Sequence, residues 1–448
     1  MTKTTLERPF ATGPISAQML QELGQYVVMD PMPFVLDLER SHGMRLATVD
    51  GQELFDWAGF YGSKLLGHNH PGLSEPDYAR RLLIAANNKT ANPDFLTPEC
   101  LAFYRKLHAV APLAMRGDGL EVYTVNSGAE AVENMMKYLV SRFTSKKVKE
   151  GQPVGNRRFV YFDKAFHGRT VFALGVTQTM DPVATKDFHG LTSGGNLKLP
   201  FPSYDSDRTD AENEKRIENV LQMLETILSQ MADEIVGVIV EPIQGAGGQR
   251  VALPSFFRGL SETCHRHGVA LAFDEVQTGL AVTGSMFAID QFDLAHPPCA
   301  VATGKKFGVG VVYMREPLED VGVLDSTWGG TLADMVRVTH ELDIVERDHL
   351  VAYAAEMGAY LNESLRELQR RHFGVMLNVR GMGLYQGFSL DSPARKSEVI
   401  RVARDQYSTL LLGCGAQSIR FRPNLSVTRE DVDELIQILD AVLTEVGR

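Results

Sequence analysis

The middle of the chain alternates short apolar segments with longer amphipathic ones, and this alternation constrains the fold more than any other feature. Ile235–Val240 is a run of Ile and Val broken only by Gly237, which is typical of a buried parallel strand. Ala129–Phe143 carries apolar residues at three- and four-residue spacing, which predicts a helix. Strands that alternate with helices predict a mainly parallel sheet covered by helices on both faces.

The same patterns place the remaining elements. The other predicted strands of this region are Leu120–Val125, Arg158–Phe162, Val269–Phe273, Ala300–Thr303 and Gly310–Met314, and the other predicted helices are Ala211–Met231 and Ser255–His267, the latter opened by Ser255. Before this region we expect a helix and short strands at Phe34–Leu38, Arg45–Val49 and Glu53–Trp57, and after it a long helix at Leu332–Arg347, then a second helix and short strands. We expect residues 1–69 to contribute to a small domain, residues 70–331 to form the large domain, and residues 332–448 to form the C-terminal part of the small domain.

Composition excludes several classes of protein. The 448 residues include 45 Lys and Arg against 56 Asp and Glu, and the net charge of −11 argues against a nucleic-acid partner. No apolar run approaches the ~18 residues that a membrane span requires, and residues 1–19 do not resemble a signal peptide. The four cysteines are scattered without a CxxC pair, so their spacing predicts neither a metal cluster nor a disulfide framework. We therefore expect a cytoplasmic protein with no metal and no membrane partner.

In a parallel sheet, ligands bind at the carboxyl ends of the strands, so the polar residues that follow the predicted strands form the candidate site. Ser127, Gly128 and Ala129 follow the strand that ends at Val125 and begin a helix. Such a turn offers a hydroxyl, free backbone N–H groups and the positive end of the helix dipole, which suits a phosphate. A serine N-cap without any ligand explains the same residues.

Charged residues follow two other predicted strands. Asp274 ends a buried apolar strand, where an unpaired carboxylate is costly; its partner would be a protonated heterocyclic nitrogen or, more simply, a helix N-terminus or an arginine. Lys305 and Lys306 follow Thr303, and a desolvated lysine there would be an amine nucleophile. The alternative is a pair of surface lysines, which is the commoner fate of adjacent lysines.

Phe166 and Arg169 complete the set of candidate residues. They would supply a flat ring face and an anion clamp, although a core phenylalanine beside a solvated arginine explains them as well. The set is more informative than its members. A phosphate turn, an aromatic face, a buried Asp and a lysine, in this chain order, are the groups that pyridoxal phosphate requires.

Longer runs of sequence extend this interpretation. They are Asn126–Ala131, Phe166–Arg169, Glu241–Gly245, Asp274–Gly279, Gly304–Lys306, Ser326–Gly330 and Arg420–Pro423. With these runs the chain resembles the class III (ω-) aminotransferases of the fold-type I pyridoxal-phosphate enzymes. The resemblance implies an α/β fold, with a large domain built on a mainly parallel seven-stranded sheet between helices and a smaller α+β domain built from both chain ends.

Within the class, the chain most resembles the lysine 6-aminotransferases. This likeness rests on the runs Glu241–Gly248, Gly304–Lys306, Asp325–Gly330 and Asp334–Arg337. One position departs from the pattern, because Thr331 stands where asparagine usually follows the Gly-Gly pair.

The resemblance also implies roles for individual residues. Lys305, rather than Lys306, would form the Schiff base with the cofactor, and Asp274 would pair with the pyridine nitrogen. The other implied cofactor-binding residues are Ser127, Gly128 and Ala129 at the phosphate, Phe166 and Val276 at the two ring faces, Gln277 at the ring hydroxyl, His167, and Ser326 and Thr327 from the neighbouring subunit. The implied substrate-binding residues are Arg420 for the α-carboxylate of glutamate, Arg169 for its distal carboxylate or the α-carboxylate of lysine, and Glu241, which would mask Arg420 when no carboxylate is bound.

The implied reaction moves the terminal amine of L-lysine to 2-oxoglutarate, in a homodimer with its active sites at the interface. Three alternatives remain at this stage. The first is a class III aminotransferase that acts on ornithine, 4-aminobutyrate or a diamine. The second is an aminomutase or racemase on the same scaffold, and the third is a pyridoxal-phosphate-binding regulator without activity.

Overall fold

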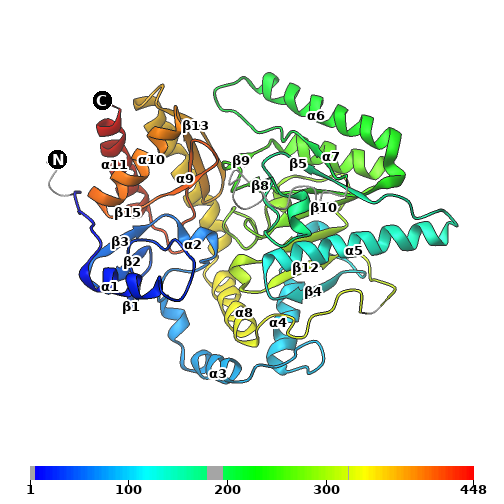
Figure 1. The fold of residues 1–448 in the computed structure, drawn as a ribbon, viewed down its shortest axis with the longest axis horizontal. Coiled ribbons are helices and arrows are strands. Elements are labelled where there is room, and N and C mark those ends of the chain that lie inside the picture. Colours follow the sequence, from blue (N-terminus) through cyan, green and yellow to red (C-terminus); the bar gives the residue numbers. More distant parts are fainter. Residues whose placement is uncertain (1–5, 179–194, 321, 448) are drawn as a thin grey trace.

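A seven-stranded sheet forms the centre of the larger lobe (Figure 1). The structure, a computed structural model, describes residues 6–178, 195–320 and 322–447. In spatial order the strands are β4 (Glu121–Val125), β12 (Gly310–Met314), β11 (Ala300–Thr303), β10 (Ala270–Glu275), β7 (Ile235–Val240), β5 (Arg158–Phe162) and β6 (Leu197–Leu199). Of these seven strands, β12 alone runs opposite to the others, so the predicted mainly parallel sheet is confirmed.

Successive residues of the central strands face two different apolar cores, as expected for strands buried on both faces. The helices on these faces are α5 (Gly128–Lys149), α6 (Asp210–Met231) and α7 (Pro254–Arg266). Val236 and Ile239 of β7 pack with α5, whereas Val238 and Val240 join the core that includes α6 and α7. On the face towards α5, Gly237 admits Leu139 to within 3.2 Å of the position that a Cβ would occupy.

Both ends of the chain build the smaller lobe, so the blue and red parts of the ribbon lie together (Figure 1). Its N-terminal elements are α1 (Pro14–Leu23), β1 (Leu36–His42), β2 (Arg45–Thr48), β3 (Glu53–Asp56) and α2 (Gly59–Gly62), and its C-terminal elements are α9 (Leu350–Arg371), β13 (Met376–Met382), β14 (Tyr385–Leu390), α10 (Pro393–Tyr407), β15 (Thr409–Leu410), β16 (Leu412–Cys414), β17 (Ser418–Arg420) and α11 (Arg429–Val446). β15 completes the first sheet by pairing parallel to β3, with Thr409 opposite Phe55. The second sheet has the order β13-β14-β17-β16.

Three further α-helices and a two-stranded ribbon lie in the described part of the chain. They are α3 (Pro76–Asn87), α4 (Pro98–Ala109), α8 (Leu332–Arg347), β8 (Ile243–Gln244) and β9 (Arg250–Val251). The long helix α8 packs against both α3 and α4. Among the residues that the structure describes, no helix is both long and apolar enough to cross a membrane.

The beginning of α7 differs from its prediction. The helix begins at Pro254, and Ser255 is not its cap; the Ser255 hydroxyl instead donates to the carboxylate of Glu214, at 2.9 and 3.0 Å from its two oxygens. Proline suits a first helical position because the N–H that it lacks would have had no partner inside the helix. The expectation that Ser255 opens α7 is therefore wrong. The helix begins one residue earlier, at Pro254, and no side chain caps it.

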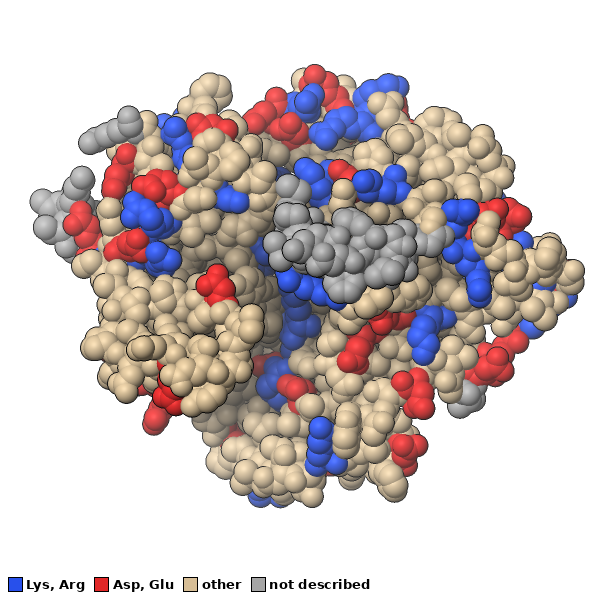
Figure 2. Space-filling model, viewed as in Figure 1, with Lys and Arg blue, Asp and Glu red and all other residues tan. Residues whose placement is uncertain are grey.

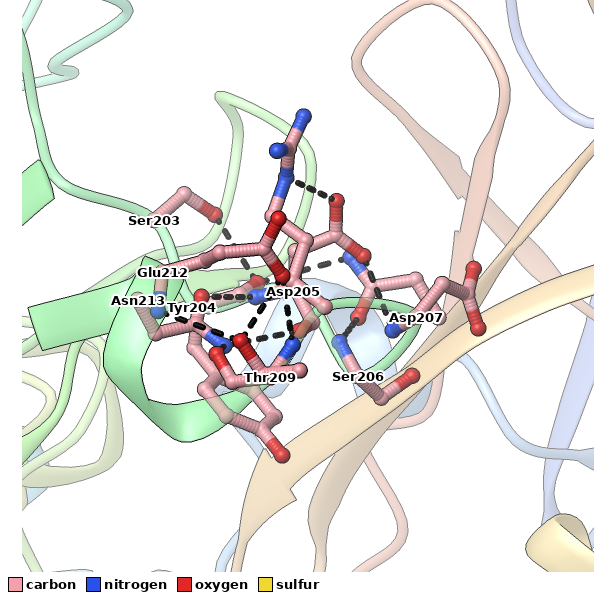
Figure 3. Close-up of polar contacts among 10 residues, drawn as sticks. Ser203, Tyr204, Asp205, Ser206, Asp207, Thr209, Glu212 and Asn213 are labelled. Carbon is pink, nitrogen blue, oxygen red and sulfur yellow. Dashed lines mark hydrogen bonds and ion pairs between the residues drawn. The ribbon is translucent and has the colours of Figure 1, made fainter. Parts of the chain in front are cut away.

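The loop that leads into α6 is fixed by a dense set of hydrogen bonds (Figure 3). Thr209 and Glu212 form a capping box, in which each side chain accepts a hydrogen bond from the backbone N–H of the other residue. Asn213 reaches back to both the N–H and the carbonyl of Asp205, at 3.0 Å in each case. Ser206 N–H then donates to Asn378 Oδ1 of β13 at 3.0 Å, which ties this loop to the smaller lobe.

We expect Gly358→Ala to destabilise the protein, although alanine has the higher helix propensity. Gly358 lies in α9, and a Cβ there would approach the backbone carbonyl carbon of Gly383 to 2.1 Å, which only a backbone shift can relieve. The matched control is Gly259→Ala in α7, where a Cβ would meet the flexible end of the Leu221 side chain. Chemical denaturation should show a loss of about 1–3 kcal/mol for Gly358→Ala and a smaller change for the control. A Gly358→Ala protein as stable as the parent would contradict this packing.

Candidate active site

The predicted site residues come together at the carboxyl edge of the large sheet. Glu241 follows β7, Asp274 lies at the end of β10, and Lys305 follows β11. These three strands are neighbours in the sheet, so their ends lie side by side. The space-filling view shows a hollow between the two lobes, with Lys and Arg side chains gathered along it (Figure 2).

Close backbone approaches hold the Ser127–Ala129 turn beside the lysine. A Cβ on Gly304 would lie 3.0 Å from the Cα of Gly128, and a Cβ on Gly128 would lie 2.6 Å from Cγ1 of Val276. Neither glycine therefore leaves room for a side chain. Ser127 is the N-cap of α5, and its Oγ accepts a hydrogen bond from Glu130 N–H at 3.2 Å. The N–H groups of the first helical turn have no partner inside the helix, so the cap and an anion-binding turn are compatible here.

Asp274 and His167 form a buried pair. Nδ1 of His167 lies 2.8 Å from Oδ2 of Asp274, and Oδ1 of Asp274 accepts the Val276 N–H at 2.9 Å. Burial lowers the pKa of His167, but the hydrogen bond and the charge of Asp274 outweigh burial and leave that pKa above its ordinary value. The alternatives of a helix N-terminus or an arginine as the partner of Asp274 are thus replaced by a histidine from the Phe166–Arg169 run.

Glu241 is held by a backbone group. Its Oε1 accepts the Phe166 N–H at 2.9 Å, and burial raises its pKa to about 8. Nε and Nη1 of Arg420 are buried, and neither has a hydrogen-bond partner among the described residues. In this conformation Glu241 therefore contacts the Phe166 backbone and leaves two nitrogens of the Arg420 guanidinium free to bind another group.

The two lysines have different surroundings. Nζ of Lys305 donates to the carbonyl of Tyr61 at 3.0 Å, and burial, together with Arg420 and Arg422, lowers the pKa of Lys305 to about 7. Lys306 is fully buried rather than exposed, and its Nζ donates to the carbonyl of Gln277 at 2.6 Å. Burial also holds the pKa of Lys306 well below its ordinary value. Lys305 is therefore an amine with a pKa near 7 among the other site residues. Lys306 instead supports the backbone of the segment that follows Asp274.

Arg422 is a site residue to which the sequence assigned no role. It is fully buried, and its Nη2 donates to Oε1 of Gln249 at 2.6 Å and to Oε1 of Gln277 at 2.8 Å. Its guanidinium carbon lies 4.1 Å from the centre of the Tyr385 ring, and burial lowers its pKa to about 9. A signal was present, because Arg420 and Arg422 are two residues apart at the end of a strand, which places both side chains on one side of the chain.

The remaining predicted residues lie at the periphery of the site. Arg169 is exposed, with its guanidinium carbon 6.0 Å from the centre of the half-buried Phe166 ring. Thr327 is exposed, and Oγ of Ser326 lies 3.5 Å from Nδ2 of Asn126 in the same chain. Arg169 thus borders the Phe166 ring, and Ser326 borders the residue that precedes the Ser127–Ala129 turn.

Thr331, the position that departs from the family pattern, has a clear structural role. It is the N-cap of α8, and its hydroxyl accepts a hydrogen bond from Asp334 N–H at 3.2 Å. Threonine and asparagine are both favourable caps, so the substitution preserves the beginning of the helix.

Known proteins resemble this chain along almost its whole length. L-lysine-epsilon aminotransferase of Amycolatopsis lactamdurans is 32% identical over 99% of this chain and 100% of its own length. A probable mitochondrial 4-aminobutyrate aminotransferase of Caenorhabditis elegans is 28% identical over 96% of this chain and 92% of its own length. The solved structure of a lysine aminotransferase from M. tuberculosis is 30% identical, with a TM-score of 0.89 over 96% of this chain and 99% of that chain. The family model described as aminotransferase class-III matches residues 26–443, and the chain therefore belongs to the class III aminotransferases.

Proposed function

We propose that this class III aminotransferase moves the ε-amino group of L-lysine to 2-oxoglutarate. The products are 2-aminoadipate 6-semialdehyde, which cyclises to piperideine-6-carboxylate, and L-glutamate. Relatives named L-lysine-epsilon aminotransferase from two genera, at 31–32% identity over almost the whole chain, support lysine as the donor. The observation that carries the proposal is the buried Arg420 guanidinium near the Lys305 amine, because two of its nitrogens lack a partner in the part of the chain that the structure describes and lysine, 2-oxoglutarate and glutamate all carry carboxylates.

The site fits pyridoxal phosphate, the cofactor of this family. The Ser127–Ala129 turn suits its phosphate, and the Asp274 carboxylate suits a protonated ring nitrogen. The amine of Lys305, whose pKa is lowered to about 7, suits an aldehyde, and the half-buried Phe166 offers a ring face. Oε1 of Gln277 accepts a hydrogen bond from Arg422, so the amide nitrogen of Gln277 is the group left for the ring hydroxyl. When bound, the cofactor supplies an electron sink for the carbon that carries the amine.

The residues of the chain then have separable tasks. Lys305, with its pKa near 7, takes a proton from the substrate carbon and would deliver it to the cofactor carbon that carried the aldehyde. His167 holds the Asp274 carboxylate through a contact of 2.8 Å, and this carboxylate would favour a proton on the ring nitrogen of the cofactor. Arg420 binds the α-carboxylate of glutamate, and Arg169 binds the second carboxylate or the carboxylate of lysine.

The proposal includes a homodimer with shared active sites, in which Ser326 and Thr327 of each subunit serve the phosphate of the other. A second subunit could bury several exposed apolar side chains of this chain. They are Tyr26, Val28 and Met29 after α1, and Phe95 and Leu96 before α4. We also propose the division into residues 1–69, 70–331 and 332–448, in view of the pairing between β3 and β15. The four free cysteines support a reducing compartment such as the cytoplasm.

A panel of amino donors with 2-oxoglutarate tests the proposed substrate. We expect glutamate to form fastest with L-lysine, with piperideine-6-carboxylate as the second product, and more slowly with ornithine, 4-aminobutyrate and a diamine. Omission of 2-oxoglutarate should stop the reaction after the first half-reaction, with one amino group transferred per site. Faster glutamate formation with any other donor would replace lysine in the proposal, and sustained turnover without 2-oxoglutarate would indicate an aminomutase or racemase.

Lys305 should be the lysine that the cofactor labels, with a pH midpoint near 7. Its lowered pKa makes the amine neutral, and therefore nucleophilic, above about pH 7 rather than above the range of an ordinary lysine. Cofactor-free protein is incubated with pyridoxal phosphate at several pH values, reduced with borohydride and mapped by peptide mass spectrometry. Lys305→Ala should abolish the label and Lys306→Met should retain it. A label on Lys306, or a midpoint near that of a surface lysine, would contradict the assignment.

Glu241→Ala should slow the half-reaction with lysine and spare the half-reaction with glutamate. Masking of Arg420 requires the Glu241 carboxyl to leave the Phe166 N–H and to be ionised. Because its pKa is raised to about 8, it is mostly protonated below pH 8 and ionised above it. The difference between parent and variant should therefore grow from pH 7 to pH 9, up to about tenfold to a hundredfold, the range expected of one charge-assisted contact.

Single-turnover changes in cofactor absorption measure the two half-reactions separately. Glu241→Gln is the matched control, since it keeps the size of the side chain and cannot ionise. It should resemble the parent at pH 7 and the alanine variant at pH 9. Equal slowing of both half-reactions at both pH values would assign Glu241 a structural role only.

A further inference from the structure

The turn formed by Ser326–Gly330 is held by side chains from two distant segments. Nδ2 of Asn92, in the loop between α3 and α4, donates to the carbonyls of Trp328 at 2.8 Å and Gly330 at 2.9 Å. From β4, Thr124 Oγ1 donates to the carbonyl of Gly329 at 2.6 Å. Three successive backbone carbonyls of the turn are therefore bound by two buried side chains.

The conformation of the turn makes these bonds necessary. Gly329 and Gly330 have φ values of +59° and +94°, in a region that favours glycine. Because glycine also adopts many other conformations, these two residues alone do not fix the turn. A Cβ on Gly329 would lie 3.1 Å from Cγ of Pro93, and a Cβ on Gly330 would lie 2.5 Å from Cγ1 of Val309. The glycines allow the close approach, and the hydrogen bonds select one conformation among those that glycine allows.

We infer that Asn92 is a positioning residue for the cofactor phosphate of the second subunit, because it holds the turn that presents Ser326 and Thr327. The inference rests on the proposed function, in which these two hydroxyl residues act across the dimer. Asn92 is only 5% exposed, so its side-chain amide lies in a fixed environment. The amide group is needed as a double donor: leucine has a similar size without N–H groups, and aspartate would place oxygens against two carbonyl oxygens.

The position of Lys89 is consistent with this role of the loop. Its Nζ lies 4.2 Å from the centre of the Trp328 ring, so the same loop contacts both the backbone and the side chain at the turn. Asn88, in contrast, donates to the Ile84 carbonyl at 2.7 Å, at the end of α3, and is exposed. Asn88→Ala is therefore a matched control that removes a neighbouring amide with no bond to the turn.

The first measurement is the dissociation constant of pyridoxal phosphate from the dimer, followed by absorbance and fluorescence. Asn92→Leu should weaken cofactor binding by about tenfold or more, the effect of losing one well-made phosphate contact. Thr124→Val, which keeps its shape and loses the third hydrogen bond, should weaken it in the same direction, and Asn88→Ala should leave it unchanged. Thr124→Val keeps the inference testable if Asn92→Leu does not fold. Unchanged affinity in the folded variants would overturn the inference.

The second measurement distinguishes the two subunits by combining Asn92→Leu with Lys305→Ala in differently tagged chains. When the two substitutions are in separate subunits, the only site with Lys305 receives an intact turn from its partner and should bind cofactor as tightly as the parent. When both are in one subunit paired with a parent chain, the only site with Lys305 receives the altered turn and should bind weakly. Equal affinity in the two heterodimers would show that Asn92 does not act across the interface.

These outcomes are separable from those of the proposed function. Thr327→Ala tests the proposed phosphate contact directly, because unchanged affinity in that variant removes the contact that Asn92 is inferred to position. Weakened binding in Thr327→Ala with unchanged binding in Asn92→Leu leaves the contact and removes only the inference. Neither measurement uses an amino donor, so failure of lysine in the donor panel affects neither result.

Discussion

The removal of charged groups from water is the constraint on which the active site depends. At the carboxyl edge of the sheet, burial raises the pKa of Glu241 to about 8 and that of Glu275 to about 7, and lowers the pKa of Lys305 to about 7. The pKa values of these two acids and this base thus all shift towards neutral pH, because a low-dielectric environment penalises the charged form of each group. His167 is the exception, because its hydrogen bond to Asp274 at 2.8 Å and the charge of that carboxylate outweigh burial and raise its pKa.

The packing of the large lobe produces this environment. Strands buried on both faces by α5, α6 and α7 end in a common edge, and the smaller lobe contributes Arg420, Arg422 and the Tyr61 carbonyl to the same place. Gly128 and Gly304 let the phosphate turn and the lysine segment approach without a side chain between them. The chemistry therefore depends on the helices that cover the sheet as much as on the residues at its edge.

Much of the fold could be predicted from sequence because its strands are continuous apolar runs. The bounds of β5, β7, β11, β12 and α8 agree with their predictions to the residue, and the rule that ligands bind at strand ends located Asp274 and Lys305. The direction of β12 was not predictable, since an apolar run has no direction. The cap of α7 was misassigned because Pro254 needs no capping side chain.

What sequence could not provide is contacts between groups far apart in the chain. The partner of Lys305 is a backbone carbonyl at Tyr61, and the partners of Arg422 are the amides of Gln249 and Gln277. Burial of Lys306 contradicts the usual fate of adjacent lysines, and it follows only from the way that the lobes meet. Asn92 carries no motif at all, and only its two bonds to the Ser326–Gly330 turn make it notable.

The pairing of β15 with β3 has a consequence for how the chain is made. The sheet that β1, β2 and β3 begin needs a strand that starts at Thr409, so it stays incomplete until almost the whole chain has left the ribosome. At about 5–20 residues per second, that interval lasts tens of seconds, during which the edge of β3 is open to other strands. Strands β1, β2 and β3 thus wait for a partner from a much later part of the chain, and the free edge of β3 is exposed to mispairing in the meantime.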